Sequence, residues 1–422
     1  MVILYNAICF LISLVYFPVY LMRGKFHRGF LARLGFLPRD LSLDNPIWIH
    51  AVSVGEAMAV RGLVRELRNM YPGKKFVIST VTATGNKIAQ GIAAEGDFVT
   101  YLPLDFSGLV NRVIQRIRPS LFIVAETEIW PNLFLGFSRN GVPIITVNGR
   151  ISDRSFKGYC TIKFFITPIL DKVSLFCVQT VRDAERLQCL GVDPEKIKVT
   201  GNMKFDITQA DPKKDYGLIK ARLGLGAHEK LFVAASTHPG EEAIILAVFR
   251  QLRDAHGPLR LLIAPRHPER AASVQTLIEQ SGFLAQRLSQ ASGQPAAQAV
   301  FILDTIGELV SFYAIADIVF VGGSFVKTGG HNILEPASLE KPVFFGPHMF
   351  NFRDIAELFI RNNAARMVQN EKELSAQIAE FLRFPDKAAA LGKAAGSLVT
   401  RNQGATRRNA ELIARFRRGQ AR

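Results

Sequence analysis

A carboxylate stands at the junction between an apolar run and a helical pattern near the start of the chain. In "WIHAVSVGEAMA" (48–59) the apolar run stops at Ser53, Gly55 permits a tight backbone, and Glu56 follows directly. Two interpretations compete. Either Glu56 complements the positive end of a helix, or it projects from the top of a sheet into a cleft and takes a proton from a substrate.

Six further polar or glycine-rich clusters directly follow a predicted strand. They are "ETEIWPN" (126–132), "NGRISDRS" (148–155), "GNMKFD" (201–206), "STHPGEE" (236–242), "PRHPER" (265–270) and "GGSFVKTGGHNILEPA" (322–337). Ligands of open α/β sheets bind beyond the carboxyl ends of the strands, so this agreement indicates an active cleft. Any one cluster taken alone also fits ordinary loop and cap chemistry.

The last cluster has the most specific chemistry. Gly329 and Gly330 let a backbone approach a ligand closely. Pro336 is tolerated only in the first turn of a helix, so we expect a helix to begin near Asn332. Glu335 is then placed to accept hydrogen bonds from ribose hydroxyls, as acidic residues do in nucleotide-binding folds. The alternative is a glycine turn followed by a capped helix.

Several function classes lose support because their motifs are missing. The sequence contains no GxxxxGK[ST] motif, and no GxGxxG follows the first strand, which disfavours kinases and nicotinamide dehydrogenases. HExxH and GxSxG are also absent, which disfavours zinc proteases and α/β-hydrolases. None of the four cysteines forms a CxxC pair or has zinc-site spacing, so we expect a reduced, cytosolic compartment.

The elements that must position these clusters are short apolar runs alternating with helical patterns. The runs are continuous rather than alternating, which is typical of parallel strands covered on both faces by helices. The predicted strands are 47–52, 75–80, 98–103, 121–126, 143–148, 174–179 and 197–201, then 231–236, 260–265, 299–304, 317–322 and 342–346. A polar stretch (206–230) separates the two groups. A chain of 422 residues exceeds one core, so the sequence predicts two doubly wound α/β domains.

The net charge and residues 1–22 indicate that the protein associates with a membrane. The net charge of +16 favours an anionic partner: nucleic acid, an acidic membrane surface or a phosphorylated substrate. Residues 1–22 carry no charge and are long enough to cross a bilayer. Five basic residues follow before the first acid: Arg23, Lys25, Arg28, Arg33 and Arg39. We therefore predict an uncleaved membrane anchor, with the bulk of the protein on the cytoplasmic side of the inner membrane. The basic flank would contact an anionic membrane surface, which explains part of the charge without nucleic acid.

Together the motifs resemble those of the bacterial 3-deoxy-D-manno-octulosonic acid (Kdo) transferases. "HAVSVGE", "AETEIWPN", "NGRISDRS", "GNMKFD", "APRHPER" and "GGHNILEPA" occur in that family's order and spacing over nearly the whole chain. The resemblance implies a GT-B glycosyltransferase with two Rossmann-like domains facing a cleft. It assigns 23–210 to the acceptor domain and 211–400 to the donor domain, with the basic segment 401–422 crossing back to the first.

The resemblance also implies the reaction. The donor would be CMP-Kdo and the acceptor lipid IVA, the lipid A precursor, in lipopolysaccharide core biosynthesis. Transfer would invert the anomeric carbon without a metal or cofactor, and one Kdo residue or several in succession are both compatible with the motifs.

Residue roles follow by the same resemblance. Glu56 would be the general base, while Glu126 and Lys204 would stabilise charge in the transition state. Arg266 suits a phosphate because its guanidinium is a fork of donors. The full set of CMP-binding residues implied is Pro265, Arg266, Ile306, Gly307, Glu308, Asn332, Ile333, Leu334 and Glu335. Without the resemblance, residues 306–308 read as a capped helix start.

Two rivals remain at this point. One is another nucleotide-sugar enzyme of the same fold, such as a UDP-sugar epimerase or a lipid-linked N-acetylglucosaminyl transferase. The other is a membrane-anchored, non-enzymatic protein that binds nucleic acid or lipid. The second explains the charge and the anchor but leaves the clusters at the strand ends without a role.

Overall fold

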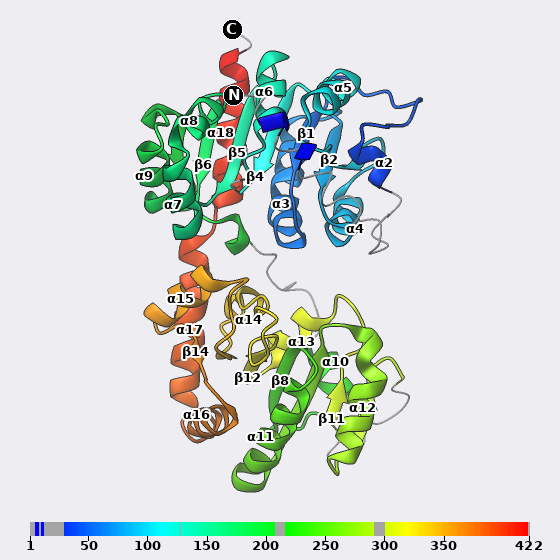
Figure 1. The fold of residues 1–422 in the computed structure, drawn as a ribbon. Helices are drawn as coiled ribbons and strands as arrows, with labels where there is room; N and C mark the ends of the chain where they lie inside the picture. Colours follow the sequence, from blue (N-terminus) through cyan, green and yellow to red (C-terminus); the bar gives the residue numbers. More distant parts are fainter. Residues whose placement is uncertain are drawn as a thin grey trace. The chain divides into compact units, whose positions relative to one another are not determined.

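The computed structural model describes residues 5–7, 10–11, 29–126, 128–206, 216–290 and 300–420 (Figure 1). The chain divides into two compact units. The first contains the residues up to Asp206 together with those from Asn402 onward, and the second runs from Ile207 to Arg401. Each unit is Rossmann-like, built on its own seven-stranded sheet of parallel strands.

The first sheet has the strand order β3-β2-β1-β4-β5-β6-β7. Its strands are β1 (Ile47–His50), β2 (Phe76–Thr80), β3 (Phe98–Tyr101), β4 (Leu121–Ala125), β5 (Ile144–Gly149), β6 (Leu175–Val178) and β7 (Ile197–Val199). Each lies within or next to a strand that the sequence predicts. The order reverses between β1 and β4, and a doubly wound sheet has its ligand crevice at such a reversal.

Helices cover both faces of the first sheet because its strands are apolar on both sides. In β1, Trp48 faces one hydrophobic core while Ile47 and Ile49 face another, as the alternation of side chains along a strand requires. The first core holds α5 (Ser107–Ile117), α6 (Pro131–Arg139), α8 (Lys163–Leu170) and α9 (Val181–Cys189) against the sheet. The second holds α3 (Val54–Met70), α4 (Ala83–Ile92) and α18 (Ala405–Gln420). The helices α2 (Phe30–Arg33) and α7 (Asp153–Thr161) and the 3₁₀ turns η1 (Pro194–Lys196) and η2 (Met203–Phe205) also belong to the unit.

The C-terminal helix α18 is capped by a carboxylate of the first unit that lies far from it in the sequence. Asp206 accepts hydrogen bonds from the backbone N–H of Gly404, at 2.6 Å, and of Thr406. These are among the N–H groups that a helix leaves unpaired at its start, so Asp206 caps α18 from about 200 residues away. The guanidinium of Arg408 adds a hydrogen bond of 2.8 Å to the carbonyl oxygen of Thr200.

The second sheet has the order β10-β11-β9-β8-β12-β13-β14, with its reversal between β8 and β12. Its strands are β8 (Lys230–Thr237), β9 (Leu259–Pro265), β10 (Ala285–Arg287), β11 (Val300–Ile302), β12 (Ile318–Val321), β13 (Val343–Phe345) and β14 (Arg366–Met367). Sequence analysis predicts the five inner strands and misses β10 and β14. These two are the edge strands, and neither carries an apolar run because neither is fully buried.

The helices of the second unit pack around this sheet. They are α10 (Tyr216–Arg222), α11 (Glu241–His256), α12 (Ala271–Gln280), α13 (Leu309–Ile315), α14 (Leu334–Ser338), α15 (Arg353–Arg361), α16 (Glu371–Arg383) and α17 (Pro385–Asn402), with the 3₁₀ turn η3 (Pro268–Arg270). The core that they share with β8, β9, β11 and β12 is lined by fully buried residues such as Phe232, Ile263 and Phe320.

The predicted anchor, residues 1–22, lies outside the described residues except for 5–7 and 10–11. No helix within the described part of the chain is long and apolar enough to span a bilayer. The hydroxyl of Tyr5 donates a hydrogen bond of 2.9 Å to the carboxylate of Asp105, and the Asn6 amide lies 3.3 Å from the Ser107 hydroxyl. These residues of the predicted anchor therefore contact the first unit.

Replacing the distant cap should loosen the first unit. In Asp206→Ala, the N–H groups of Gly404 and Thr406 lose their acceptor, and we expect the free energy of unfolding to fall by about 1–3 kcal/mol. Both tryptophans, Trp48 and Trp130, belong to the first unit, so urea unfolding followed by tryptophan fluorescence reports on that unit alone.

Asp171→Ala is the matched control. Its carboxylate is 65% exposed and pairs with Lys196 at 3.3 Å, so its loss should change the free energy of unfolding by less than about 1 kcal/mol. Equal effects of the two substitutions would contradict the capping role of Asp206.

Candidate active site

Glu56 lies in the first turn of α3, directly beyond the carboxyl end of β1. The hydroxyl of Ser53 accepts a hydrogen bond from the Glu56 backbone N–H, at 3.4 Å, and donates one of 2.9 Å to Glu56 Oε1. Glu56 Oε2 accepts a hydrogen bond of 2.7 Å from the backbone N–H of Val52. This exchange of hydrogen bonds closely resembles a capping box. Glu56 therefore does contact the start of the helix, as the helix-end interpretation expects.

The same carboxylate has the ionisation behaviour of a base for neutral pH. Its side chain is buried, and the pKa of Glu56 is raised to about 7, with burial as the largest cause. The negative charges of Glu126 and, more weakly, Glu128 contribute to this rise, while the hydrogen bonds from Val52 and Ser53 oppose it. A carboxyl group with such a pKa can accept and release a proton near neutrality. The two interpretations of Glu56 are therefore compatible.

Glu126 and Lys204, to which the resemblance assigns the stabilisation of charge in the transition state, form one ion pair. Lys204 Nζ lies 2.8 Å from Glu126 Oε1, and each side chain is 23% exposed. Glu126 follows β4, the strand next to β1 at the reversal of strand order, and has a φ of 57°. The structure therefore brings Glu56, Glu126 and Lys204 to one crevice of the first unit.

Asn148 positions Lys204 and was not singled out by sequence analysis. It is fully buried at the end of β5, and its Oδ1 accepts a hydrogen bond of 2.9 Å from the backbone N–H of Met203. Met203 begins η2, the turn that carries Lys204. The available signal was the Asn-Gly dipeptide at 148–149, since asparagine tolerates the left-handed conformation that Asn148 adopts, with a φ of 55°.

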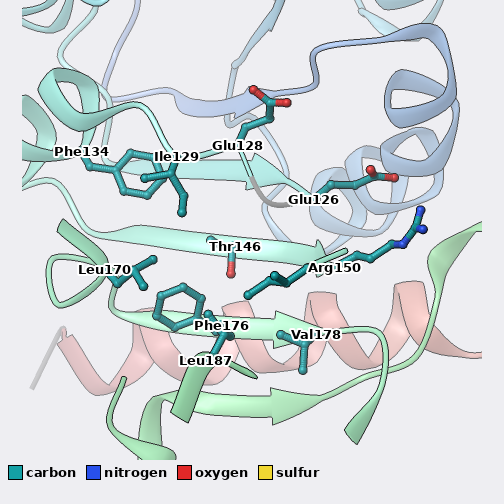
Figure 2. Close-up of a pocket in the computed structure, with 12 residues that line it drawn as sticks. Glu126, Glu128, Ile129, Phe134, Thr146, Arg150, Leu170, Phe176, Val178 and Leu187 are labelled. Atoms are coloured by element: carbon teal, nitrogen blue, oxygen red, sulfur yellow. The ribbon is translucent and has the colours of Figure 1, made fainter. Parts of the chain in front are cut away.

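A narrow pocket opens beside these charges (Figure 2). Glu126 and Arg150 stand at the carboxyl ends of β4 and β5, whereas Phe176 and Leu170 lie deeper. The pocket is lined by Glu126, Glu128, Ile129, Phe134, Thr146, Gly149, Arg150, Ile151, Leu170, Phe176, Val178 and Leu187. Its free volume of about 10 Å³ is enough for about one water molecule, so a larger group would enter only after side chains move.

The predicted donor residues lie in the second unit, where they form two separate groups. Arg266 directly follows Pro265, the last residue of β9, and its exposed side chain acts electrostatically on Glu335, whose pKa burial raises. The Asn332 amide links this group by donating a hydrogen bond of 3.1 Å to Glu335 and accepting one of 3.0 Å from the Leu334 N–H. Ile333 and Leu334 are almost completely buried in the unit.

The second group, residues 306–308, forms the helix start that the residues by themselves suggest, but Glu308 at its N-cap makes no side-chain capping hydrogen bond. Glu308 precedes α13, accepts a hydrogen bond from the Thr305 hydroxyl and pairs with Arg222 of α10 at 2.7 Å. Ile306 is 88% exposed, and Gly307 has a φ of 92°. A role of these three residues in nucleotide binding stays a prediction.

Gly329 and Gly330 adopt backbone conformations that favour glycine. Both have positive φ, 101° and 73°. A Cβ on Gly329 would meet the Asn351 side chain at 2.2 Å, and one on Gly330 would meet Met349 Sδ at 2.2 Å. The close approach that these glycines permit is to the protein's own segment 349–351. The helix expected near Asn332 is α14, which begins at Leu334.

Known proteins resemble this chain over most of its length. The family model of 3-deoxy-D-manno-octulosonic-acid transferase (kdotransferase) matches residues 28–207. The 3-deoxy-D-manno-octulosonic acid transferase of Haemophilus influenzae is 36% identical over 369 residues, which cover 87% of this chain and 86% of that protein. The chain belongs to the Kdo transferase family. Its relative in Bordetella pertussis is 33% identical over 385 residues, covering 88% of this chain and 87% of that protein.

Kdo transferases are glycosyltransferases, so the non-enzymatic alternative and the epimerase alternative are both set aside. The likeness to an epimerase is one of fold. UDP-GlcNAc 2-epimerase from Neisseria meningitidis, bound to UDP-GlcNAc, matches with a TM-score of 0.58 at 12% identity, over 88% of this chain and 100% of that one.

The raised pKa of Glu56 predicts how the stability of the first unit changes with pH. Because the folded state binds the proton more tightly than an ordinary carboxyl with a pKa of 4.5, ionisation of Glu56 costs stability as pH rises from about 4.5 to 7. The full cost, on the order of 3 kcal/mol, is present above pH 7. Glu56→Gln removes this cost, so between pH 5 and pH 8 the variant should lose less stability than the wild type.

Urea unfolding followed by tryptophan fluorescence at the two pH values measures this difference. Glu185→Gln, which removes an exposed carboxylate of α9, should follow the wild type. Parallel pH dependences of wild type and Glu56→Gln would show that the pKa of Glu56 is ordinary.

Proposed function

We propose that this Kdo transferase moves Kdo from CMP-Kdo to lipid IVA with inversion at the anomeric carbon, and that Glu56 is the general base. The observation that carries the proposal is the buried Glu56 carboxyl, with its pKa of about 7, at the crevice between β1 and β4. Inversion requires a base on the face of the sugar opposite to the leaving group. A carboxylate that ionises near neutrality suits that task.

In the proposed reaction the oxygen of an acceptor hydroxyl forms a bond to the anomeric carbon of Kdo. Glu56 takes the hydroxyl proton, and the bond between that carbon and the phosphate oxygen breaks, so that CMP leaves with the electron pair. Glu56 can receive this proton while keeping its contacts with Ser53 and Val52, since a carboxyl oxygen has more than one lone pair.

The Glu126–Lys204 pair would act on the charges that develop. Fixed partners stabilise a transition state most where water is excluded. The Glu126 carboxylate suits an oxocarbenium-like carbon, and Lys204 suits an anion, either the Kdo carboxylate or the departing phosphate. Their ion pair of 2.8 Å holds both groups in place before the substrates arrive. It also keeps the Glu126 charge near Glu56, where that charge raises the pKa of the base.

The donor would bind to the second unit, and no metal or cofactor enters the proposal. The exposed guanidinium of Arg266 would bind phosphate, and Glu335 would accept hydrogen bonds from the ribose. We further propose that the two Rossmann-like units face a cleft, as in the GT-B arrangement. The segment 1–22 would anchor the enzyme on the cytoplasmic side of the inner membrane, and the basic residues after it would contact anionic lipid. One or more Kdo residues would then be added during lipopolysaccharide core biosynthesis.

A transfer assay tests the base. Purified full-length enzyme, detergent-dispersed lipid IVA and CMP-Kdo are mixed, and the products are read by mass spectrometry, which also counts the Kdo residues added. Glu56→Gln should lower kcat about 10²–10⁴-fold, the usual contribution of a positioned proton acceptor. Protection against thermal unfolding by CMP, and not by UDP, should remain because Glu56 belongs to the other unit.

Glu185→Gln is again the control and should keep full activity. Full activity of Glu56→Gln would return Glu56 to a purely structural role and move the search for a base to Glu126 and Glu128. A wild type that CMP protects but that transfers no Kdo to lipid IVA would show that the acceptor is wrong.

The pH profile gives an independent test. Only ionised Glu56 can accept a proton, so kcat/KM should fall about tenfold for each pH unit below about 7 and level off above it. Glu128→Gln removes one of the negative charges that raise the pKa of Glu56, so the break in its profile should lie at lower pH. A wild-type profile that stays flat down to pH 5.5 would contradict Glu56 as the base.

A further inference from the structure

Three histidines gather where the strand order of the second sheet reverses. His238 follows β8, His331 lies in the segment after β12, and His267 follows the neighbouring strand β9. The Nε2 atoms of His238 and His331 are 2.8 Å apart, with the two rings parallel to within 5°. The ring of His267 stands nearly perpendicular to that of His238, with centroids 6.1 Å apart. The functions assigned so far use none of these side chains.

A contact of 2.8 Å between two imidazole nitrogens limits the protons that the pair can hold. One nitrogen must donate a proton to the lone pair of the other. The pair can take up one additional proton and become an imidazolium–imidazole pair, in which the hydrogen bond is charge-assisted and stronger. A second additional proton would place two positive charges side by side.

The surroundings keep the pair neutral when no anion is bound. Burial is the largest cause and lowers the pKa of both rings, that of His331 to about 4. The positive charge of Arg266 acts on His331 and that of Arg270 on His238, and His267 disfavours a proton on either ring. Glu241 and Glu242 on α11 oppose these effects at His238.

The two carboxylates that favour a proton on His238, those of Glu241 and Glu242, already have hydrogen-bond partners within the protein. Glu241 is fully buried and accepts hydrogen bonds from four backbone N–H groups, those of His238, Gly323, Ser324 and Phe325. Glu242 accepts a hydrogen bond from the Thr237 hydroxyl, at 2.9 Å, and pairs with Arg270 at 2.7 Å. Both negative charges are therefore largely neutralised before a ligand arrives, and an added anion would change the balance at the histidines.

Arg266 is the nearby cation that faces outward. Its backbone N–H is bonded to the Thr237 carbonyl oxygen at 3.0 Å, which fixes the loop beside His238. In the described part of the chain its guanidinium has no ion pair, and its side chain is exposed. A phosphate bound by Arg266 would bring negative charge to the site where Arg266 now opposes a proton on His331.

We propose that the His238–His331 pair takes up one proton from solvent when the phosphate of a cytidine nucleotide binds beside Arg266, and returns it when the nucleotide leaves. The proposal rests on the proposed CMP-Kdo donor and deepens it. The added positive charge would lie beside the phosphate that gains negative charge as CMP departs, where it stabilises the leaving group. The two histidines are thus binding residues whose proton content depends on the ligand.

Calorimetric titration of the full-length enzyme with CMP tests the proposal. At pH 6, in two buffers of different ionisation enthalpy, the wild type should take up close to one proton more per CMP than His331→Gln. CMP itself titrates in this range, so the difference between the two proteins is the quantity that isolates the pair. When CMP binding takes up one proton, the affinity for CMP changes by up to tenfold per pH unit. We therefore expect the wild type to bind CMP about tenfold more tightly than the variant at pH 6. At pH 8.5 the two should agree within about twofold.

Three controls separate the outcomes. His228→Gln removes an exposed histidine of the same unit and should leave both the proton uptake and the affinity unchanged. Cytidine, which lacks the phosphate, should bind without proton uptake. His238→Gln should reproduce His331→Gln, and it replaces that variant if thermal melting shows that His331→Gln does not fold.

Equal proton uptake by wild type and His331→Gln would overturn the inference while leaving CMP as the ligand. A variant that loses affinity equally at pH 6 and pH 8.5 would show a structural role for the histidines and would also overturn it. Absence of CMP binding by the wild type at both pH values would overturn the proposed donor, and the inference with it.

Discussion

The reversal of strand order in each parallel sheet is the constraint on which the sites depend. Between β1 and β4, and again between β8 and β12, the chain leaves adjacent strands in opposite directions, so a crevice opens at their carboxyl ends. Glu56 follows β1 and Glu126 follows β4, whereas His238 follows β8 and His331 lies beyond β12. The charged and titratable groups that matter most are therefore neighbours because of topology, although 70 residues of sequence separate Glu56 from Glu126.

Within the first crevice, one carboxylate serves both the fold and the proposed chemistry. The hydrogen bonds of Glu56 with Ser53 and Val52 fix the start of α3, and burial in that position raises its pKa. The orientation of the side chain and its basicity thus have a common origin. Glu126 adds to the basicity by its charge, and its ion pair with Lys204 holds Glu126 in place.

In the second unit the buried carboxylates are paired within the protein. Its buried carboxylate Glu241 is satisfied by backbone N–H groups, and Glu242 by an arginine, so neither is available to act on a substrate. What remains responsive is a pair of imidazoles next to an outward-facing arginine. A site made of neutral, protonatable groups suits a ligand whose negative charge grows during the reaction.

Much of this architecture can be read from the sequence because hydropathy is local. Continuous apolar runs mark the inner strands, polar clusters mark their carboxyl ends, and the motif set identifies the family. The edge strands β10 and β14 escape because a strand that is not fully buried needs no apolar run. The sequence predicts a close approach at the two glycines at 329–330, but their contact with segment 349–351 was visible only in the fold.

The contacts that define the sites could only be decided by tertiary structure. Lys204 meets Glu126 across 78 residues of sequence, His331 meets His238 across 93, and Asp206 caps a helix that begins about 200 residues later. No periodicity records such pairs, since they depend on which strands lie side by side and how far each loop extends. The sequence determined which residue types stand at the strand ends. Strand order determined which of these residues touch. Burial determined which of them titrate near neutral pH.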